Sequence, residues 1–229
     1  MTSHPSRPLR ARSLAEKRQR RADILRAAED LWAATSYADL SMNQVASAAR
    51  LAKGTLYLYF DTKEELFLAL VDAHLDAWID RAAALLEERR ARTPAQVADV
   101  LLEAGLEATA LRRLLVLFGT VLERRVRPQL LQEFRQRLGR RLEGLLALMP
   151  LERELAQRAL SHLYALSVGW QHLSEQPDIW AAASAVPLPA TGGQDALDRP
   201  QDRLGLNAEE YRLAVRAVFE RLTRVPQPV

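Results

Sequence analysis

The sequence predicts an all-α protein of about nine helices with no sheet. Glycine is scarce, at 9 of 229 residues, and the helix-favouring residues Ala, Leu, Arg and Glu outnumber the β-branched ones. Apolar residues recur at helical spacing along most of the chain, and short polar breaks separate these stretches. The helices divide into an N-terminal group of three and a larger C-terminal group.

Composition also limits the class of protein. The chain contains no cysteine, which excludes disulfide bonds and thiolate metal sites. No stretch approaches about 18 consecutive apolar residues, and the basic N-terminus continues into a charged stretch rather than an apolar one. We therefore expect a cytoplasmic protein with no membrane-spanning segment, no metal and no cofactor.

Basic residues are concentrated at the N-terminus. The first 22 residues contain seven Lys or Arg and one Glu, an excess larger than the net charge of +3 for the whole chain. A short basic segment suits a polyanion, because each neutralised phosphate releases counterions, although a solvated tail would have the same composition. We assign residues 1–13 to a flexible basic arm and expect the first helix over 14–34.

Two short helices are predicted after a break at 35–37. Ser41 and Gln44 form an S-x-x-Q capping box at the start of the first, which covers 41–49. The second covers 52–60, so only a few residues join the two, which is the arrangement of a helix-turn-helix. Two apolar side chains of the second helix, Leu56 and Phe60, are expected to face inward. Its exposed side would then carry Lys53, Thr55, Tyr57 and Tyr59.

Residues 41–67, SMNQVASAARLAKGTLYLYFDTKEELF, resemble the DNA-binding head of TetR-type repressors, whose hallmark is K-G-T-L-Y-x-Y-F-x-x-K-x-x-L. The clear resemblance covers about residues 18–70 and implies a homeodomain-like head over 14–62. Singly, its polar residues could be ordinary surface or packing residues, but their combined spacing favours binding to double-stranded DNA. The residues that the resemblance assigns to DNA are Ser41, Asn43, Arg50, Lys53, Gly54, Thr55, Tyr57, Tyr59 and Lys63.

Three positions depart from the family pattern. Arg50 stands where the turn usually has a glycine in the left-handed conformation, and Ala52 stands where a serine usually caps the recognition helix. Ser36 replaces a common glycine before Tyr37. We expect each of the first two changes to cost about 1 kcal/mol of stability, and a phosphate contact by Arg50 would offset part of its cost.

The C-terminal region, residues 63–229, is predicted to contain the remaining helices and one long loop over 175–206. Thr62 with Glu65 forms a second capping box. Thr93 before Pro94 marks another helix start, because proline is well tolerated at the first helical position. The expected helices cover 62–90, 94–109, 111–125, 128–149, 151–174 and 207–223.

One predicted helix is unusually apolar. From Ala159 to Leu173 it is apolar on nearly all sides, so it must be buried on more than one face. The resemblance implies that the last two long helices, 151–174 and 207–223, form a four-helix interface in a homodimer. Such a dimer would hold two recognition helices about one DNA turn apart, as a palindromic operator requires.

The C-terminal region carries no catalytic signature, and its dispersed histidines form no metal site, so no enzyme is expected. The resemblance implies a ligand pocket framed by the fourth to eighth helices. Taken singly, each candidate lining residue is better explained as an ordinary core residue. A pocket made of them would accept a small apolar or aromatic effector. Because Glu123 would add a negative charge to the pocket, the effector could also carry a positive charge. The candidates are Trp78, Leu114, Phe118, Leu122, Glu123, Phe134, Tyr164 and Trp170.

These features predict a sequence-specific transcriptional repressor that a small-molecule ligand releases from its operator, with a shift of 62–90 changing the separation of the two heads. The alternative is a ligand-independent DNA-binding protein, either a nucleoid organiser or a regulator controlled by a protein partner. A filled C-terminal core would favour this alternative. A helical enzyme with an incidental helix-turn-helix would need a polar site with paired carboxylates.

Overall fold

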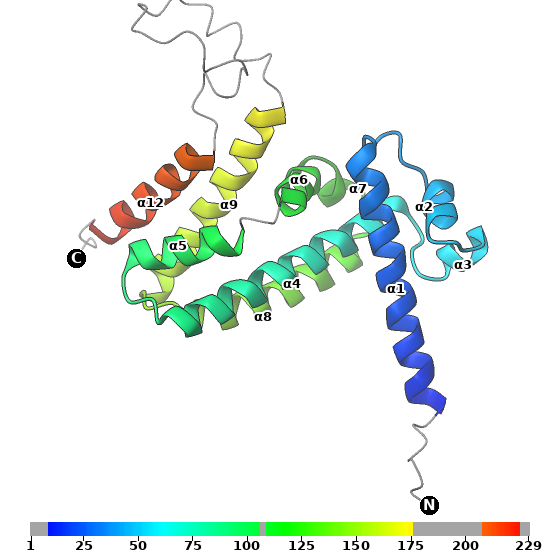
Figure 1. Ribbon diagram of the computed structural model, residues 1–229, viewed down its shortest axis with the longest axis horizontal. Helices are drawn as coiled ribbons and strands as arrows, with labels where there is room; N and C mark the ends of the chain where they lie inside the picture. The colour runs from blue at the N-terminus through cyan, green and yellow to red at the C-terminus, as the bar shows by residue number, and fades with distance from the viewer. Residues whose placement is uncertain (1–8, 106–108, 176–207, 225–229) are drawn as a thin grey trace, which may run out of the picture. The chain divides into compact units, whose positions relative to one another are not determined.

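The computed structural model describes residues 9–105, 109–175 and 208–224, and within these ranges helices are joined by turns and loops, with no strand. Over these residues the all-α prediction is confirmed. The chain divides into two compact units, Met1–Leu70 and Val71–Val229 (Figure 1). Helix α4, Lys63–Arg89, contributes residues to both units.

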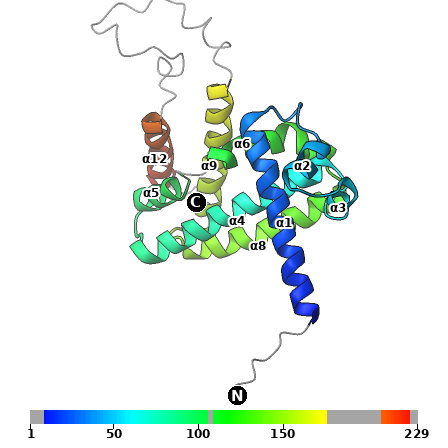
Figure 2. The same ribbon diagram turned by 45° about the vertical axis from the view of Figure 1, so that its right-hand side comes forward.

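The first unit contains α1 (Leu9–Ala34), α2 (Met42–Ala48), α3 (Lys53–Tyr57) and the beginning of α4. Helix α2 packs against α1 and α3, and both short helices lie on one side of α1 in Figures 1 and 2. The rings of Trp32 and Tyr37 meet Phe67 edge to face, at centroid distances of 5.5 and 4.9 Å, which stabilises the unit beyond the burial of the rings. The buried core includes Ile24, Ala28, Trp32, Val45, Leu56, Phe60, Leu66 and Phe67.

Two features of this unit differ from the sequence expectation. Helix α1 begins at Leu9 rather than at residue 14, because Leu, Ala and Arg after Pro8 all favour helix, so part of the predicted arm is helical. Residues 1–8 lie outside the described residues. Helix α3 is shorter than 52–60, and its last predicted residues form turns that still bury Phe60.

The second unit contains the remainder of α4 and the helices that follow it. Helix α12 packs against α5 and α9, and α6 also packs against α9. The described helices of this unit are α5 (Pro94–Ala104), α6 (Thr109–Leu117), the π-helix η1 (Phe118–Leu122), α7 (Glu123–Arg125), α8 (Pro128–Leu148), α9 (Arg153–Glu175) and α12 (Ala208–Arg224).

Helices α4 and α8 run side by side in both ribbon views, and ion pairs join them (Figure 2). The Arg137 guanidinium lies 2.8 Å from the Asp72 carboxylate, and Arg141 binds both Asp76 and Asp80. These side chains are largely exposed, so the pairs orient the two helices and contribute little stability individually.

Several predicted boundaries are corrected by the structure. The helix expected over 94–109 ends at Ala104, because Gly105 terminates it. The helix expected over 111–125 is not uniform, since it contains η1, where the Glu123 N–H binds the Phe118 carbonyl five residues earlier. Most of the predicted loop, 176–206, lies outside the described residues. No helix in the described ranges is both long and apolar enough to cross a membrane.

Candidate DNA-binding head and C-terminal cavity

Helix α3 presents a polar surface because its apolar side chains face the core. Leu56 is fully buried, whereas Lys53 is exposed and the Tyr57 ring is 39 % exposed. The Lys53 ammonium lies 5.9 Å from the centroid of the Tyr57 ring, so the two side chains form one exposed cationic and aromatic patch. A Cβ atom added at Gly54 would meet nothing within 4 Å, which leaves the start of the helix open to close approach. Thr55 and Tyr59 are half-buried beside this patch.

The turn between α2 and α3 is held by backbone hydrogen bonds. The Leu51 N–H donates to the Ala46 carbonyl at 2.8 Å and the Arg50 N–H to the Ser47 carbonyl at 3.1 Å, which is the Schellman pattern. This pattern requires a left-handed residue, and Arg50 has φ of 55°. Helix α3 then begins at Lys53, and its N-cap residue Ala52 makes no side-chain capping bond. The strained arginine and the missing cap expected from the sequence are therefore both present.

Lys63 is occupied within the head. Its ammonium donates to the carbonyls of Tyr37 and Leu40 at 2.7 and 2.8 Å and lies 4.3 Å from the centroid of the Tyr37 ring. The side chain is half-buried, and one of its three donors remains for a phosphate. The sequence pattern gave no sign of these bonds, because their acceptors are backbone carbonyls far away along the chain.

At the start of α2, capping and DNA candidates coincide. The Ser41 hydroxyl accepts from the Gln44 N–H, and the Gln44 side chain accepts from the Ser41 N–H at 2.7 Å, so the predicted capping box is confirmed. Asn43 is exposed on the first turn. The second box is modified, since Thr62 caps the Glu65 N–H but the Glu65 carboxylate accepts from Asp61.

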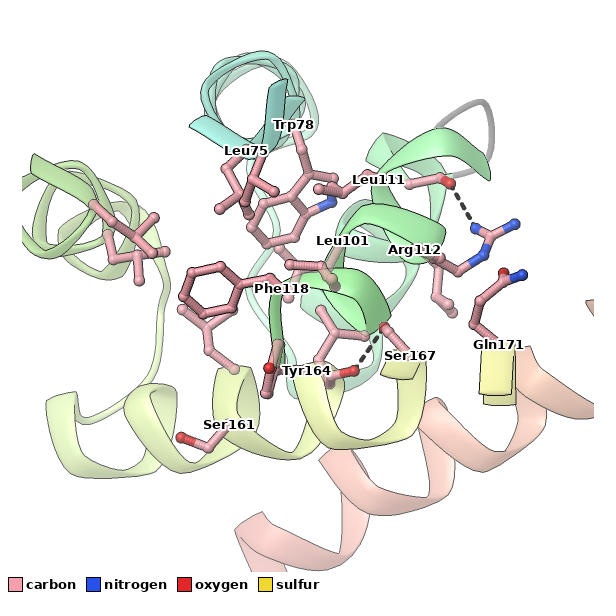
Figure 3. A pocket seen from close by; sticks show the side chains of 18 of the residues that line it. Leu75, Trp78, Leu101, Leu111, Arg112, Phe118, Ser161, Tyr164, Ser167 and Gln171 are labelled. Carbon is pink, nitrogen blue, oxygen red and sulfur yellow. Dashed lines mark hydrogen bonds between the residues drawn. The ribbon is translucent and has the colours of Figure 1, made fainter. Parts of the chain in front are cut away.

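The second unit contains a partly open cavity of about 900 Å³ between α4, α5, α6, α8, α9 and α12 (Figure 3). Its wall is mainly apolar, as in most small-molecule sites. Five of the eight candidates line it, and they are Trp78, Phe118, Phe134, Tyr164 and Trp170.

Three of the candidate residues do not line the cavity. Leu114 and Leu122 are fully buried in the surrounding core, and the Glu123 carboxylate forms an ion pair with Arg135 at the surface. Because Glu123 does not line the cavity, it gives no reason to expect a cationic ligand there. Sequence reasoning missed the leucines of α4 and α8 in the wall, because a lining leucine and a core leucine follow the same helical spacing. The missed lining residues include Leu75, Leu138, Leu142 and Leu146.

Polar groups gather at one end of the cavity. The hydroxyls of Ser167 and Tyr211 lie 2.7 Å apart, and the Arg112 guanidinium donates to the Gly105 carbonyl at 3.1 Å (Figure 3). Burial raises the pKa of the Tyr211 hydroxyl, although the hydrogen bond with Ser167 and the charge of Arg112 both lower it. No cluster of potential metal ligands occurs in the parts of the chain that the structure describes.

The comparisons with known families cover both units. The pattern described as bacterial regulatory proteins, tetR family, matches residues 24–70, and the tetracyclin repressor-like C-terminal domain matches residues 72–192, more than half of the chain. The chain belongs to the tetR family of regulators. The head of this tetR-family protein is thus its DNA-binding domain, and the family that the sequence resembled is confirmed.

Individual relatives of this tetR-family chain match over different lengths. An uncharacterized HTH-type transcriptional regulator of Lactococcus lactis is 38% identical over 55 residues, 24% of this chain and 28% of the relative. The fatty acid metabolism regulator protein of Bacillus subtilis is 29% identical over 76 residues, 33% of this chain and 39% of the relative. The match thus spans well under half of either curated relative.

The fold similarity extends further along the tetR-family chain. A TetR-family transcriptional regulator from Streptomyces coelicolor has a TM-score of 0.55 and 20% identity, covering 89% of this chain and 99% of that one. At this identity the comparison concerns the fold alone.

Proposed function

We propose that the protein is a homodimeric repressor that binds a palindromic operator and is released by an apolar ligand in the C-terminal cavity. The observation that carries this proposal is the composition of α4. Its first turns supply core residues of the head, Leu66 and Phe67, and its later turns supply Leu75 and Trp78 to the cavity wall. One continuous helix is therefore part of both the DNA-binding unit and the ligand-binding unit.

The exposed patch on α3 supplies the DNA contacts. Lys53 neutralises a phosphate, and the hydroxyls of Thr55, Tyr57 and Tyr59 bind phosphates or base edges while Gly54 lets the backbone approach. Around this patch, Ser41, Asn43, Arg50 and the remaining Lys63 donor contact the sugar-phosphate backbone. The target is bacterial operator DNA, so the protein acts in the cytoplasm.

The dimer is formed by α9 and α12. The side of α9 that the subunit leaves exposed carries small residues, Ala165 and Gly169, which permit close approach of a second helix. On α12 the Leu213 side chain is 51 % exposed, and an apolar residue of this size is suited to an interface. Two subunits joined in this way present two α3 helices to successive turns of DNA.

Ligand binding acts by changing the population of α4 positions. A ligand against Leu75 and Trp78 favours the position that fits it, and only a difference in affinity between the two states shifts the equilibrium. In the α4 position that the ligand favours, the distance between the two heads no longer matches the spacing of the operator half-sites. The repressor then dissociates from the DNA.

The test starts with selection of bound DNA from genomic fragments, followed by a screen for compounds that release it. Gly139→Leu fills the cavity, because Gly139 lines it and an added Cβ meets nothing within 4 Å. Gly144→Leu is the matched control on the same helix, since Gly144 is also unobstructed but lies outside the cavity. We expect both variants to bind the operator. The releasing compound should still release Gly144→Leu from the operator but not Gly139→Leu.

Two outcomes would contradict this proposal. If Lys53→Ala and Tyr57→Ala both bound the operator with unchanged affinity, α3 would not be the helix that contacts DNA. Equal release of Gly139→Leu and Gly144→Leu would place the effector outside the cavity and favour a regulator that does not use it.

A further inference from the structure

One arginine of the C-terminal unit lies at the cavity without a carboxylate partner. The Arg112 side chain is half-buried and lines the cavity, and its hydrogen bond is to the Gly105 carbonyl at 3.1 Å. In the same unit Arg137, Arg141 and Arg216 all bind carboxylates. Among the described residues no acid is paired with Arg112. Partial burial of a guanidinium costs free energy unless an anion compensates its charge. An anionic group bound at this end of the cavity would therefore be stabilised.

The neighbours of Arg112 do not supply that group. Figure 3 shows the Arg112 guanidinium and the Gln171 amide facing one another at the end of the cavity away from Phe118. The nearby Glu175 carboxylate already accepts from Gln171 at 3.0 Å and lies 3.5 Å from Arg113. Among the described residues of the cavity wall the one acid is Glu143, and it binds Arg153.

Further donors surround the same end. Arg212, an exposed cation of α12, lines the cavity there together with the hydroxyls of Ser174 and Tyr211. The Gln171 amide donates one hydrogen to Glu175 and keeps a second for an oxygen acceptor. The Ser174 hydroxyl donates to the Trp170 carbonyl, and the Tyr211 hydroxyl donates to Ser167, whose own proton goes to the Leu163 carbonyl. The donors available to a ligand at this end are therefore the two arginines and the second amide N–H of Gln171.

The opposite end of the cavity is more apolar, although the Ser161 and Tyr164 hydroxyls also lie on that side (Figure 3). Leu75, Phe118, Phe134, Leu138 and Leu142 line it, and the Phe118 and Phe134 rings are 5.5 Å apart. A cavity of about 900 Å³ with this division is suited to a ligand that is itself divided into a head and an apolar tail.

We propose that Arg112 binds the carboxylate head of an amphipathic ligand whose hydrocarbon tail occupies the apolar end. This inference rests on the proposed function and specifies the ligand class of the same cavity. The planar guanidinium matches a carboxylate in a paired geometry, and such charge-assisted bonds are about twice as strong as neutral ones. The head group pairs the arginine, and the tail displaces water from the leucine and phenylalanine wall.

Calorimetric titration of the full-length protein in the absence of DNA tests this inference. The probes are dodecanoate and dodecanol, which share a tail and differ in the charge of the head. We expect dodecanoate to bind about tenfold or more tightly than dodecanol, as one charge-assisted contact implies. In Arg112→Gln the affinity for dodecanoate should fall to that for dodecanol, whose own affinity stays unchanged.

Two further variants separate the head-group contact from other effects. Arg112→Lys keeps the charge but loses the paired geometry, and should bind dodecanoate with intermediate affinity. Arg140→Gln removes an exposed cation of α8 that does not line the cavity, and should bind both probes like the parent protein. Retained dodecanol binding shows that Arg112→Gln is folded.

Several results would overturn the inference. Equal affinity for the two probes, or an unchanged preference for dodecanoate in Arg112→Gln, would show that Arg112 does not bind the head. Binding of neither probe would exclude this ligand class. None of these results affects the operator-release screen with the Gly139 and Gly144 variants, so a failure of the head-group assignment is distinguishable from a failure of the proposed function.

Discussion

The DNA-binding head and the C-terminal unit are both helical, but they use their large aromatic side chains differently. In the head, Phe67 is fully buried and is contacted edge to face by Trp32 and Tyr37. In the C-terminal unit, Phe118 and Phe134 pack against each other at the edge of a cavity of about 900 Å³. The head core is closed by its own residues, whereas the C-terminal core leaves space for another molecule.

This difference separates two requirements of a ligand-controlled regulator. A closed core holds the surface of α3 in one geometry, which recognition of a DNA sequence requires. A cavity leaves apolar surface without packing contacts. A ligand that fills the cavity therefore raises the free energy of unfolding of the unit that binds it.

Truncation of a phenylalanine should be more damaging in the head than beside the cavity. Phe67→Ala should lower the free energy of unfolding of the head by about 3–5 kcal/mol, because it leaves a void among close-packed rings. Phe118→Ala should cost clearly less, because the Phe118 side chain is only half-buried and lines the cavity. Urea denaturation, with hydrogen exchange to assign each transition to its unit, measures both values. Equal losses would show that the two cores are packed alike.

Loss of the Lys63 ammonium should destabilise the head by about 2 kcal/mol, because two backbone carbonyls lose a charged donor. Lys63→Met keeps the aliphatic part of the side chain. The matched control is Lys53→Met, which should change stability by less than about 0.5 kcal/mol and still weaken operator binding. Thermal melting and operator affinity together separate the two lysines. If Lys63→Met melted like the parent protein, Lys63 would be a DNA-contacting residue alone.

Relief of backbone strain should stabilise both units by similar amounts. It should change operator binding only when the strained residue lies in the DNA-binding head. Arg50 and Arg90 have φ of 55° and 47°, so Arg50→Gly and Arg90→Gly should each stabilise the protein by about 1 kcal/mol. Arg50→Gly should also weaken operator binding and its salt dependence, because a phosphate contact is lost. Melting curves and binding at several salt concentrations measure this. A stabilised Arg50→Gly with full affinity would limit Arg50 to a structural role.

The smallest expected effect is a pH dependence confined to the C-terminal unit. Burial raises the pKa of Tyr211 above its ordinary value of 10.0. The neutral hydroxyl is therefore favoured in the folded state, its contribution is complete below pH 10, and it is lost as the pH rises through the folded pKa. Denaturation between pH 8 and pH 11 should show this decline in the parent protein and a shallower one in Tyr211→Phe. Identical slopes would refute a role for Tyr211.

Much of the head could be predicted from sequence, because its signals are local. The Ser41 capping box, the inward Leu56 and Phe60, and the strained Arg50 each depend on residues within one or two turns. The bonds of Lys63 could not be predicted in this way. They depend on how the chain returns to backbone carbonyls more than twenty residues earlier.

The C-terminal unit could be predicted only in outline. Thr93 and Pro94 mark the start of α5 as expected, because capping is again local. Which leucines face a cavity depends instead on how several helices meet, and Leu114 and Leu138 have the same residue type and helical context. Arg112 likewise becomes distinctive only when the partners of the other arginines are known.

The π-helix η1 affects how many residues this segment of the chain can hold. A π-helical turn closes on the fifth residue rather than the fourth, so Phe118–Leu122 accommodates one residue more than an α-helical turn would. Within it the Thr120 hydroxyl binds the Val116 carbonyl at 2.8 Å, a bond that loosens the regular helical pattern. Such a turn is the form in which a helix absorbs a single inserted residue. We therefore expect a one-residue insertion or deletion in this segment to change the shape of the cavity while the flanking helices keep their packing.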